Sequence, residues 1–482
     1  MPGYQSNAPL YAALIQHGRQ NPACFHVPGH GQGKGLSPEL AGFTGQAWHS
    51  LDLTELPGLD DLHNPTGPIA AAQNLAAKMY GAEKSFFLVN GTTVGIQALI
   101  TSLGQQKKII VSRNVHRSVL GGLVIAGADP IYVLPDTIPH FEIDCGLTPG
   151  TIQQALVDSP DAAAVLVVRP SYYGIAADLE RIARIAHQSG IPILVDEAHG
   201  AHLRFHRGLP DDAMDSGADA AVQSTHKLGG SLGQSSMLHL RGSLVDAGSV
   251  TAALRLLQTT SPSYLLMASL DLARYQLSLR GSEMMEKTLY LVHSVRKRLA
   301  GCRNLHILTA DCLLGKKCRL DSTKLVISVR DLGLTGYQVN ELLARRYRVF
   351  LEMADFYNVV AFVSIGTTEE DCDRLVAALQ DIASREKLPA LPRQPAVPLL
   401  HKTAMKPRDA WFAPAERVPL GEGRGKISAE TIAVYPPGIP VLNPGEVITD
   451  EIYEYLLDMR RWGLSCQGPA DPTLKTIKVV LE

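Results

Sequence analysis

The stretch that decides the fold is "AAVLVVRPSYYGIAADLERIARIAHQSGIPILVD", residues 163–196. It opens with an apolar run at 163–168 and closes with a second apolar run at 191–196. Between the two runs, apolar residues recur at helical spacing over 179–186, and Gly190 supplies the stop. This order of strand, helix and strand predicts a mostly parallel sheet with right-handed crossovers.

Further short apolar runs surround this unit. They are "SFFLV" at 85–89, "KKIIVS" at 107–112, "PIYVL" at 130–134 and "AAVQS" at 220–224. None alternates polar with apolar residues as a half-exposed strand does, so we expect these strands to be buried on both faces. The sequence therefore predicts an α/β protein with a mostly parallel sheet in its large domain.

The length of 482 residues is too great for one ordinary hydrophobic core. We place an N-terminal segment at 1–70, a large domain at 71–320, a small α/β domain at 321–385 and a C-terminal domain at 386–482. The proline-rich stretch at 385–400 is expected to be an extended connector between the last two.

Within the small domain the pattern alternates again. Strands are predicted at 324–329, 349–353 and 358–366, and helices at 335–347 and 369–383. Each helix opens with the spacing of a capping box, Thr335 to Gln338 and Thr367 to Glu370. Farther on, "YPPGIPVLNPGE" at 435–446 is too rich in proline for a helix or a central strand and is predicted to be a packed loop.

Composition excludes several classes of function. The chain has 45 Lys+Arg against 47 Asp+Glu and no long run of one sign, which argues against binding to nucleic acid or to a membrane surface. No segment holds about 18 uncharged apolar residues in a row, and the N-terminus lacks the pattern of a signal peptide. The seven cysteines are scattered without a C-x-x-C pair, which favours a reducing, cytoplasmic setting.

In a parallel sheet, ligands bind beyond the carboxyl ends of the strands, so the residues there are the candidates for function. Gly91, Thr92 and Thr93 stand where a strand gives way to a helix, and this arrangement suits a phosphate. Asp196 ends a buried strand and needs a cationic partner, for which a protonated heterocyclic nitrogen would serve.

Lys227 follows another apolar run and would face the same side of the sheet as Asp196. His116 supplies an aromatic ring at a neighbouring strand end. A phosphate site, a buried aspartate, an aromatic ring and a lysine are together the parts needed to hold pyridoxal 5′-phosphate (PLP), whose aldehyde bonds covalently to lysine. Each of these residues alone is more often a cap or a solvated loop residue.

Two other motifs have weaker support. "DEAH" at 196–199 also occurs in a class of helicases, but that class needs a G-x-x-x-x-G-K-[ST] loop, which the chain lacks. His199, His202 and His206 could suggest a metal, yet no cysteine or suitably placed carboxylate accompanies them, and we predict no metal site.

At this point the motifs resemble a known family. "NGTTVGIQALI", "SRNVHRSV", "DEAHGAHLRFH", "STHKLGGSLGQSSMLH", "QTTSPSY" and "YPPGIPVLNPGE" resemble, in the same order, the Orn/Lys/Arg decarboxylases of fold type I, the aspartate aminotransferase-like PLP enzymes. The resemblance runs from about residue 8 to the C-terminus, and it is to the short form without an N-terminal wing domain.

The resemblance implies roles for individual residues. Lys227 would carry the cofactor, Asp196 would pair with its ring nitrogen, and His116 and Ala198 would flank its ring. The phosphate would be held by Thr92, Thr93, Ser224 and His226, while His199 would lie near the phenolic oxygen, and Lys227 or His226 would return a proton to the product. Thr259 and Thr260 would reach a neighbouring subunit's site, because this fold builds its sites at a homodimer interface.

The expected substrate is a basic amino acid, which requires a carboxylate at the far end of the pocket. The candidates are Glu55, Asp60, Asp61, Glu352, Asp355 and Glu430, each of which could instead be a surface or capping carboxylate. By resemblance to short-form biosynthetic enzymes of polyamine synthesis, arginine is the first choice, followed by lysine and ornithine. Two alternatives stay open, an aminotransferase using Arg330 as a carboxylate clamp and a non-catalytic regulatory relative.

Overall fold

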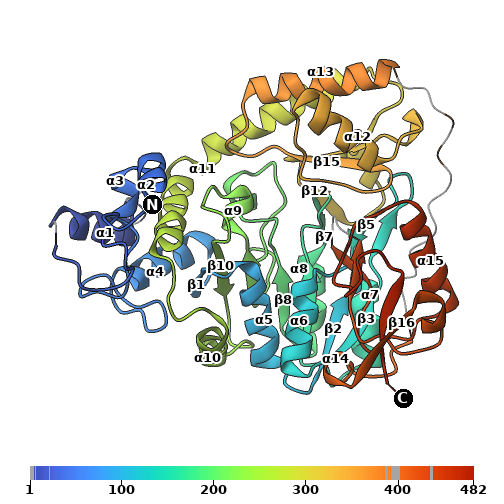
Figure 1. Cartoon of the computed structure of the whole chain (residues 1–482), viewed down its shortest axis with the longest axis horizontal. Helices are drawn as coiled ribbons and strands as arrows, with labels where there is room; N and C mark the ends of the chain where they lie inside the picture. Colours follow the sequence, from blue (N-terminus) through green and yellow to red (C-terminus); the bar gives the residue numbers. More distant parts are fainter. Residues whose placement is uncertain are drawn as a thin grey trace.

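The computed structural model describes residues 5, 7–20, 22–385, 389, 391, 402–434 and 438–481. Figure 1 shows three parts, namely a large sheet with flanking helices, a smaller α/β part that contains α12 (Gly336–Leu342) and α13 (Glu369–Arg385), and a C-terminal part beside one edge of the large sheet. The predicted connector at 385–400 falls mostly outside the described residues. No helix in the described ranges combines the length and apolarity that crossing a bilayer requires.

The central sheet has seven strands in the order β1-β10-β9-β8-β6-β2-β3. In that order the strands are β1 (Lys84–Leu88), β10 (Ser236–Leu240), β9 (Ala220–Gln223), β8 (Ile193–Asp196), β6 (Ala164–Val168), β2 (Lys108–Ser112) and β3 (Asp129–Val133). All neighbours from β9 to β3 are parallel, whereas β10 runs antiparallel to both β9 and β1. The α/β class with a mostly parallel sheet is thereby confirmed.

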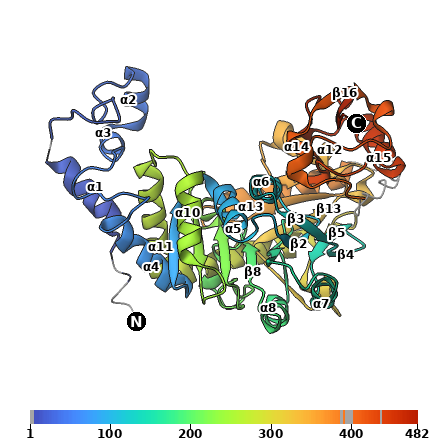
Figure 2. The same cartoon turned by 90° about the horizontal axis from the view of Figure 1, so that it is seen from below.

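Helices cover both faces of this sheet. Alternate residues of one strand enter opposite cores, so Leu194 packs with α5 (Gly91–Leu103) and α6 (Arg117–Ala126), while Val195 packs with α8 (Leu179–Gln188). Figure 2 shows α8 beside α7 (Pro149–Asp158), away from α5 and α6. Burial on both faces is confirmed for the inner strands, but β3 is only half-buried, because it lies at an edge of the sheet.

The long helix α11 (Tyr264–Leu299) leads from the large sheet to the smaller one. That antiparallel sheet has the order β11-β13-β15-β14, with β11 (His306–Ile307), β13 (Lys324–Ser328), β15 (Asn358–Phe362) and β14 (Met353–Ala354). The predicted strand at 349–353 was wrong over most of its length. Arg348 has φ +54°, which turns the chain, and Val349 and Leu351 then pack into the core without joining the ladder.

The helix starts of this part test the capping predictions. The box from Thr335 to Gln338 is confirmed, with both of its hydrogen bonds present. The second box is displaced by one residue. Thr368 and Asp371 make the reciprocal bonds, while the hydroxyl of Thr367 accepts a hydrogen bond from the backbone N–H of Ser364.

The C-terminal part contains α14 (Pro407–Phe412), α15 (Asp450–Arg461) and the strands β16 (Ala415–Pro419), β17 (Ile432–Val434), β18 (Ile439–Leu442), β19 (Cys466–Gln467) and β20 (Thr476–Val480). The predicted loop at 435–446 was partly wrong, because it contains β18, an edge strand where proline is tolerated. The buried guanidinium of Arg113 donates to the carbonyls of Pro440 and Val441, at 3.0 Å each, and so binds β18 to the end of β2.

The remaining described helices and short strands frame these three parts. They are α1 (Pro9–Arg19), α2 (Pro38–Thr44), α3 (Gln46–His49), α4 (Pro68–Tyr80), α9 (Thr225–Leu228), α10 (Ala247–Leu257), β4 (Asp136–Ile138), β5 (Ile143–Gly146), β7 (Ile175–Ala177) and β12 (Cys318–Leu320). The α4 helix and the N-terminal loop before it pack on β1 and α11 in a core of their own.

Candidate active site

A cavity opens beyond the carboxyl ends of β6 and β8, where a parallel sheet normally binds its ligand. Its walls are formed by Thr92, Asn114, His116, Asp144, Val168, Ser171, Tyr172, Tyr173, Asp196, Ala198, His199, Lys227 and Ile439. Of the residues predicted to form the site, Thr92, His116, Asp196, Ala198, His199 and Lys227 therefore line one cavity. Ile439 belongs to β18, so the C-terminal part completes one wall.

Asp196 and Lys227 come from adjacent strands. Asp196 ends β8, and Lys227 lies in α9 just after β9, which pairs in parallel with β8. The Asp196 side chain is buried and accepts a hydrogen bond from the backbone N–H of Ala198 at 3.2 Å. No Lys, Arg or His in the described part of the chain forms a salt bridge with it, so this buried carboxylate is ready for a cationic partner from a ligand.

The Lys227 amine lies close to two aromatic side chains that contact each other. Its Nζ is 2.9 Å from Nε2 of His199 and 5.5 Å from the centre of the Tyr172 ring, and those two rings are themselves 4.4 Å apart. Burial lowers the pKa of Lys227, although the carboxylates of Asp196 and Glu352 oppose that shift. Burial and the nearby charge of Lys227 hold the pKa of His199 well below its usual range, so its imidazole is neutral and accepts the hydrogen bond.

The His116 ring is fixed by the start of a helix. His116 caps α6, and its Nδ1 accepts a hydrogen bond from the backbone N–H of Ser118 at 3.2 Å. Burial lowers the pKa of His116, and this favours the neutral ring. A neutral, fixed imidazole on the cavity wall is suited to stacking against a planar ligand.

The predicted phosphate site lies at the start of α5. Gly91, the first residue of that helix, has φ +73°, which a residue with a Cβ rarely adopts. The hydroxyls of Thr92 and Ser224 lie 3.2 Å apart, and Nδ1 of His226 bonds to the carbonyl of Ser235 at 2.8 Å. Thr93 is exposed and does not line the cavity. The helix start and the paired hydroxyls provide the donors that an anion needs.

A second layer of polar groups supports the strand ends. The fully buried Glu197 accepts hydrogen bonds from Nε2 of Gln223 and from the backbone N–H of Ala213, both at 2.8 Å. Burial raises the pKa of Glu197 to about 8. Because Glu197 follows Asp196 and Gln223 ends β9, this bond ties together the two strand ends that carry Asp196 and Lys227.

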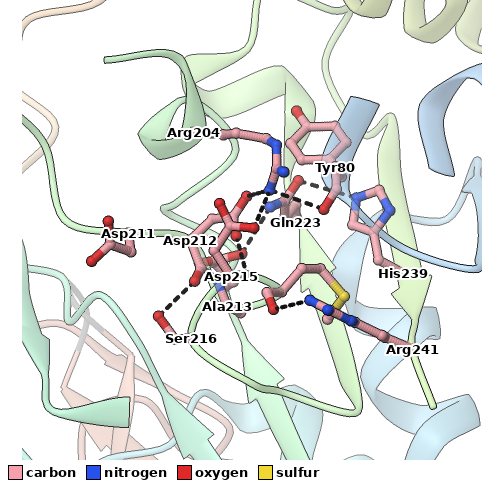
Figure 3. A network of polar contacts seen from close by, with 12 residues as sticks. Tyr80, Arg204, Asp211, Asp212, Ala213, Asp215, Ser216, Gln223, His239 and Arg241 are labelled. Atoms are coloured by element: carbon pink, nitrogen blue, oxygen red, sulfur yellow. Dashed lines mark hydrogen bonds and ion pairs between the residues drawn. The ribbon is translucent and has the colours of Figure 1, made fainter. Parts of the chain in front are cut away.

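Figure 3 shows further polar contacts, around Gln223 and Arg204. Gln223 lies beside Nε2 of His239 at 3.2 Å, and Arg204 lies between the carboxylates of Asp212 and Asp215. This polar layer fixes the loop that follows β8.

Comparison with known proteins identifies the family. Residues 8–371 match the family model described as Orn/Lys/Arg decarboxylase, major domain, and residues 393–470 match the C-terminal domain of the same family. The chain belongs to the Orn/Lys/Arg decarboxylase family. The resemblance inferred from the sequence motifs is thereby confirmed.

Relatives in this family are similar over their full length. The chain is 44% identical to the arginine decarboxylase of Bacillus subtilis strain 168, over 99% of both chains. It is 42% identical to the arginine decarboxylase of Bacillus anthracis, over 99% of this chain and 98% of that one. The structure of the Francisella novicida lysine decarboxylase LdcF matches with a TM-score of 0.85 at 22% identity, over 99% of this chain and 82% of that one, and shows the shared fold.

Among the carboxylates considered for the family's basic substrate, three are engaged elsewhere. Asp60 accepts hydrogen bonds from several backbone N–H groups at the start of α4, including that of Gly67 at 2.7 Å. Asp355 is held by the Tyr173 hydroxyl at 2.9 Å and by the amides around Asn358. Glu430 accepts from the backbone N–H groups of Ala470 and Lys478, far along the C-terminal part.

The other three carboxylates are Glu55, Asp61 and Glu352. Glu55 and Asp61 lie in the loop before α4, and neither lines the cavity. Glu352 does not line the cavity either and is exposed next to β14, but its charge raises the pKa of both Lys227 and the buried Lys324. Of these three carboxylates, it is the one whose charge acts on the Lys227 amine.

Other predicted features have different surroundings. Arg330, considered as a carboxylate clamp, pairs with Glu142 at 3.4 Å, lies over the Tyr357 ring and does not line the cavity. His202 pairs with Asp321 at 3.1 Å, and His206 pairs with Glu286 at 2.6 Å. Within the described ranges, no three His, Cys, Asp or Glu side chains are grouped closely enough to hold a metal ion.

Several residues at the site were missed from the sequence. Ser171 and Tyr172 follow the apolar run at 163–168, at the strand end where a ligand is expected, but the sequence assigned them no role. Asp144 lines the cavity and accepts a hydrogen bond from Nδ2 of Asn114 at 3.0 Å, but nothing in its local sequence indicates a site. Lys324 is the first residue of a predicted apolar strand. A lysine is unusual at such a position, and this was the only feature of the sequence that pointed to it.

Proposed function

We propose that this chain is a PLP-dependent arginine decarboxylase that converts L-arginine to agmatine and CO2. The observation that carries the proposal is that Asp196 and Lys227 line one cavity from adjacent strand ends, and that the buried Asp196 forms no ion pair with any described side chain. Relatives named arginine decarboxylase, at 42% and 44% identity over nearly the whole chain, support arginine as the substrate.

The residues present fit the cofactor. Asp196 would face its protonated ring nitrogen, the neutral His116 would stack on its ring with Ala198 on the other face, and Lys227 would bind its aldehyde. Gly91, Thr92, Ser224 and His226 would hold its phosphate near the start of α5. When bound, PLP supplies an electron sink for the bond that breaks at the substrate Cα.

The side chains then have separable tasks. Asp196 would keep a positive charge on the ring nitrogen of the bound cofactor, because a buried carboxylate needs a cationic partner. The lowered pKa of Lys227 makes more of its amine neutral, and a neutral amine is the form that attacks a carbonyl and later takes up or returns a proton. The His199 imidazole holds that amine in place through the 2.9 Å contact.

Glu352 is proposed to bind the guanidinium of the substrate. It is exposed, unlike Asp355 and Glu430, and its charge reaches the amine of Lys227. A carboxylate can bind a guanidinium through two parallel hydrogen bonds, which distinguishes arginine from lysine and ornithine.

The protein is further proposed to act as a homodimer whose site is completed by a second copy. Thr259 and Thr260 follow α10, and the backbone of Thr259 is fixed by the side chains of Asn90 and His63. This holds the segment at the carboxyl end of β1, where a second subunit could approach. Sedimentation of the purified protein would give the oligomeric state.

The test of function is direct. The purified protein is loaded with PLP, its visible spectrum is recorded before and after borohydride, and CO2 release is measured separately with arginine, lysine and ornithine. We expect a chromophore that borohydride fixes onto Lys227, release from arginine far above the other two, and neither result in Lys227→Ala. Release from lysine or ornithine above arginine would contradict the substrate assignment, and a wild type that binds no PLP would contradict the cofactor.

A further inference from the structure

Lys324 is a buried lysine without an obvious structural reason. It is the first residue of β13, it pairs with Phe362 across the ladder to β15, and its exposed fraction is 0%. Lysine is almost never fully buried unless it is paired with a carboxylate. An apolar side chain of the same length would fill this place in the core without the cost of burying an amine.

The contacts of the Lys324 amine leave it without such a partner. Its Nζ donates to the carbonyl of Ser171 at 3.2 Å and lies 4.9 Å from the centre of the Phe362 ring. No carboxylate in the described part of the chain forms a salt bridge with it, and the nearby Asp321 pairs with His202 at 3.1 Å. An ammonium has three donors, so the Ser171 carbonyl uses only one of them.

The Lys324 amine interacts electrostatically with charged groups around the cavity, including Lys227. The pKa of Lys324 is lowered to about 7, chiefly by burial; the charge of Lys227 adds to this lowering, whereas the charges of Asp321 and Glu352 oppose it. The charge of Lys227 therefore acts on Lys324, and the charge of Glu352 acts on both lysines. The amines of Lys227 and Lys324 and the exposed carboxylate of Glu352 are thus close enough for their charges to interact.

Lys324 does not line the cavity itself, but it contacts a residue that does. Ser171 and Tyr172 line the cavity, and the Ser171 carbonyl is the group that Lys324 contacts. On the other side, Phe362 lies under Lys324 and meets the ring of His199 edge to face, at 5.5 Å between centres. His199 in turn contacts Lys227. The positive charge of Lys324 thus lies behind the wall formed by Ser171, Tyr172 and His199.

We propose that the Lys324 ammonium is the charge that recognises the α-carboxylate of the substrate. The proposal rests on the proposed function, because it assumes an amino acid substrate bound at Lys227. A basic amino acid carries a carboxylate at Cα and a cation at its far end, and Lys324 and Glu352 offer the complementary charges. Because Lys324 is fully buried, its charge acts more strongly than a charge at the surface would.

The test compares an amino acid with its decarboxylated product, which lacks only the carboxylate. In Lys324→Met, the KM for arginine is expected to rise on the order of 30-fold, because the α-carboxylate loses the attraction of a buried positive charge. The inhibition constant of agmatine, which has no carboxylate, is expected to stay within about threefold of wild type. Lys324→Gln, which keeps a polar group but no charge, should show the same split. Lys108→Met, at the amino end of β2 and 40% exposed, should leave both constants unchanged.

Two results would overturn the proposal. One is an unchanged KM for arginine in both Lys324 variants with normal visible spectra. The other is a parallel rise in the KM for arginine and the inhibition constant of agmatine, which would indicate a merely structural role.

The test of Lys324 can be interpreted even if the proposed arginine decarboxylase activity is wrong. If wild type prefers lysine or ornithine, the same comparison is made with that amino acid and its own amine. If wild type decarboxylates none of the three, arginine and agmatine binding are compared by calorimetry, where no turnover interferes, and a selective loss of arginine binding in Lys324→Met still supports the role of Lys324.

Discussion

Nζ of Lys227 lies 2.9 Å from Nε2 of His199, and His199 is a fully buried, neutral acceptor for that amine. A neutral acceptor stabilises the charged form of the lysine. Removing it therefore lowers the pKa of Lys227 beyond the lowering that burial already causes. The contact sets how much of the amine is available to attack a carbonyl near neutral pH.

The first prediction follows from this contact. In His199→Leu, the pH at which PLP association with the cofactor-free protein is half-maximal should fall by about one unit. His199→Asn, which keeps an acceptor, should shift it less. Stopped-flow absorbance between pH 6 and 10 would measure both. An unchanged pH profile in His199→Leu would show that the contact does not tune the amine.

The second prediction concerns Glu352. In Glu352→Gln, the KM for arginine should rise on the order of tenfold to a hundredfold while the spectrum of bound cofactor stays the same, because the variant loses a charge-assisted bond to the guanidinium. Glu370→Gln, an exposed glutamate of α13 that pairs with Arg374, is the matched control. Equal kinetics in the two variants would show that Glu352 does not bind the guanidinium of the substrate. Glu55 and Asp61 would then be tested in the same way.

The third prediction is a dependence of stability on pH. Burial raises the pKa of Asp144 to about 6, against 3.8 for an ordinary aspartate. Between these values the folded chain keeps a proton that the unfolded chain has released, so this group's contribution to the free energy of unfolding falls as pH rises. Asp144→Asn cannot titrate and should gain on the order of 2 kcal/mol relative to wild type from pH 4 to pH 7.

Urea unfolding of the cofactor-free protein at both pH values would measure this difference. Asp161→Asn is the control with the opposite sign, because Lys108 lowers the pKa of that exposed carboxyl. A constant difference between Asp144→Asn and wild type across the range would mean that Asp144 is ionised in the folded protein at pH 4.

Much of the central fold was predictable because its signals are local. The strand, helix and strand of 163–196 carry their own periodicity, and the parallel pairing of β8 with β9 follows from the crossover rule. That pairing brings the strand ends together, so the sequence alone was enough to assign Asp196 and Lys227 to one cavity.

The rest depends on contacts between distant segments. Asp144 lines the cavity because the hairpin of β4 and β5 folds back over Asn114, and neither local sequence indicates that contact. Lys324 reaches the cavity wall only because the small sheet docks against the loop that carries Ser171. The strand predicted at 349–353 failed for a related reason, since packing of Val349 and Leu351 into the core outweighed their preference for extended structure.

The last prediction concerns the join between the large sheet and the C-terminal part. The guanidinium of Arg113 donates to the carbonyls of Pro440 and Val441 and pairs with Glu446 at 3.2 Å, and the side chains of both charged partners are at most 3% exposed. Arg113→Met would leave the Glu446 carboxylate buried without its partner. The free energy of unfolding should fall by about 3 to 5 kcal/mol. Arg113→Lys should recover little of it, because a point charge cannot serve two carbonyls and a carboxylate at once.

The double variant separates the ion pair from the carbonyl contacts. Adding Glu446→Gln to Arg113→Met removes the unpaired charge, so the double variant should be more stable than Arg113→Met alone. Urea unfolding of wild type, Arg113→Met, Glu446→Gln and the double variant would measure this difference. Because Ile439, the first residue of β18, lines the cavity, Arg113→Met should also lower kcat/KM for arginine. If the two substitutions destabilise the protein additively, the carbonyl bonds of Arg113 hold β18 in place and the ion pair adds nothing to them.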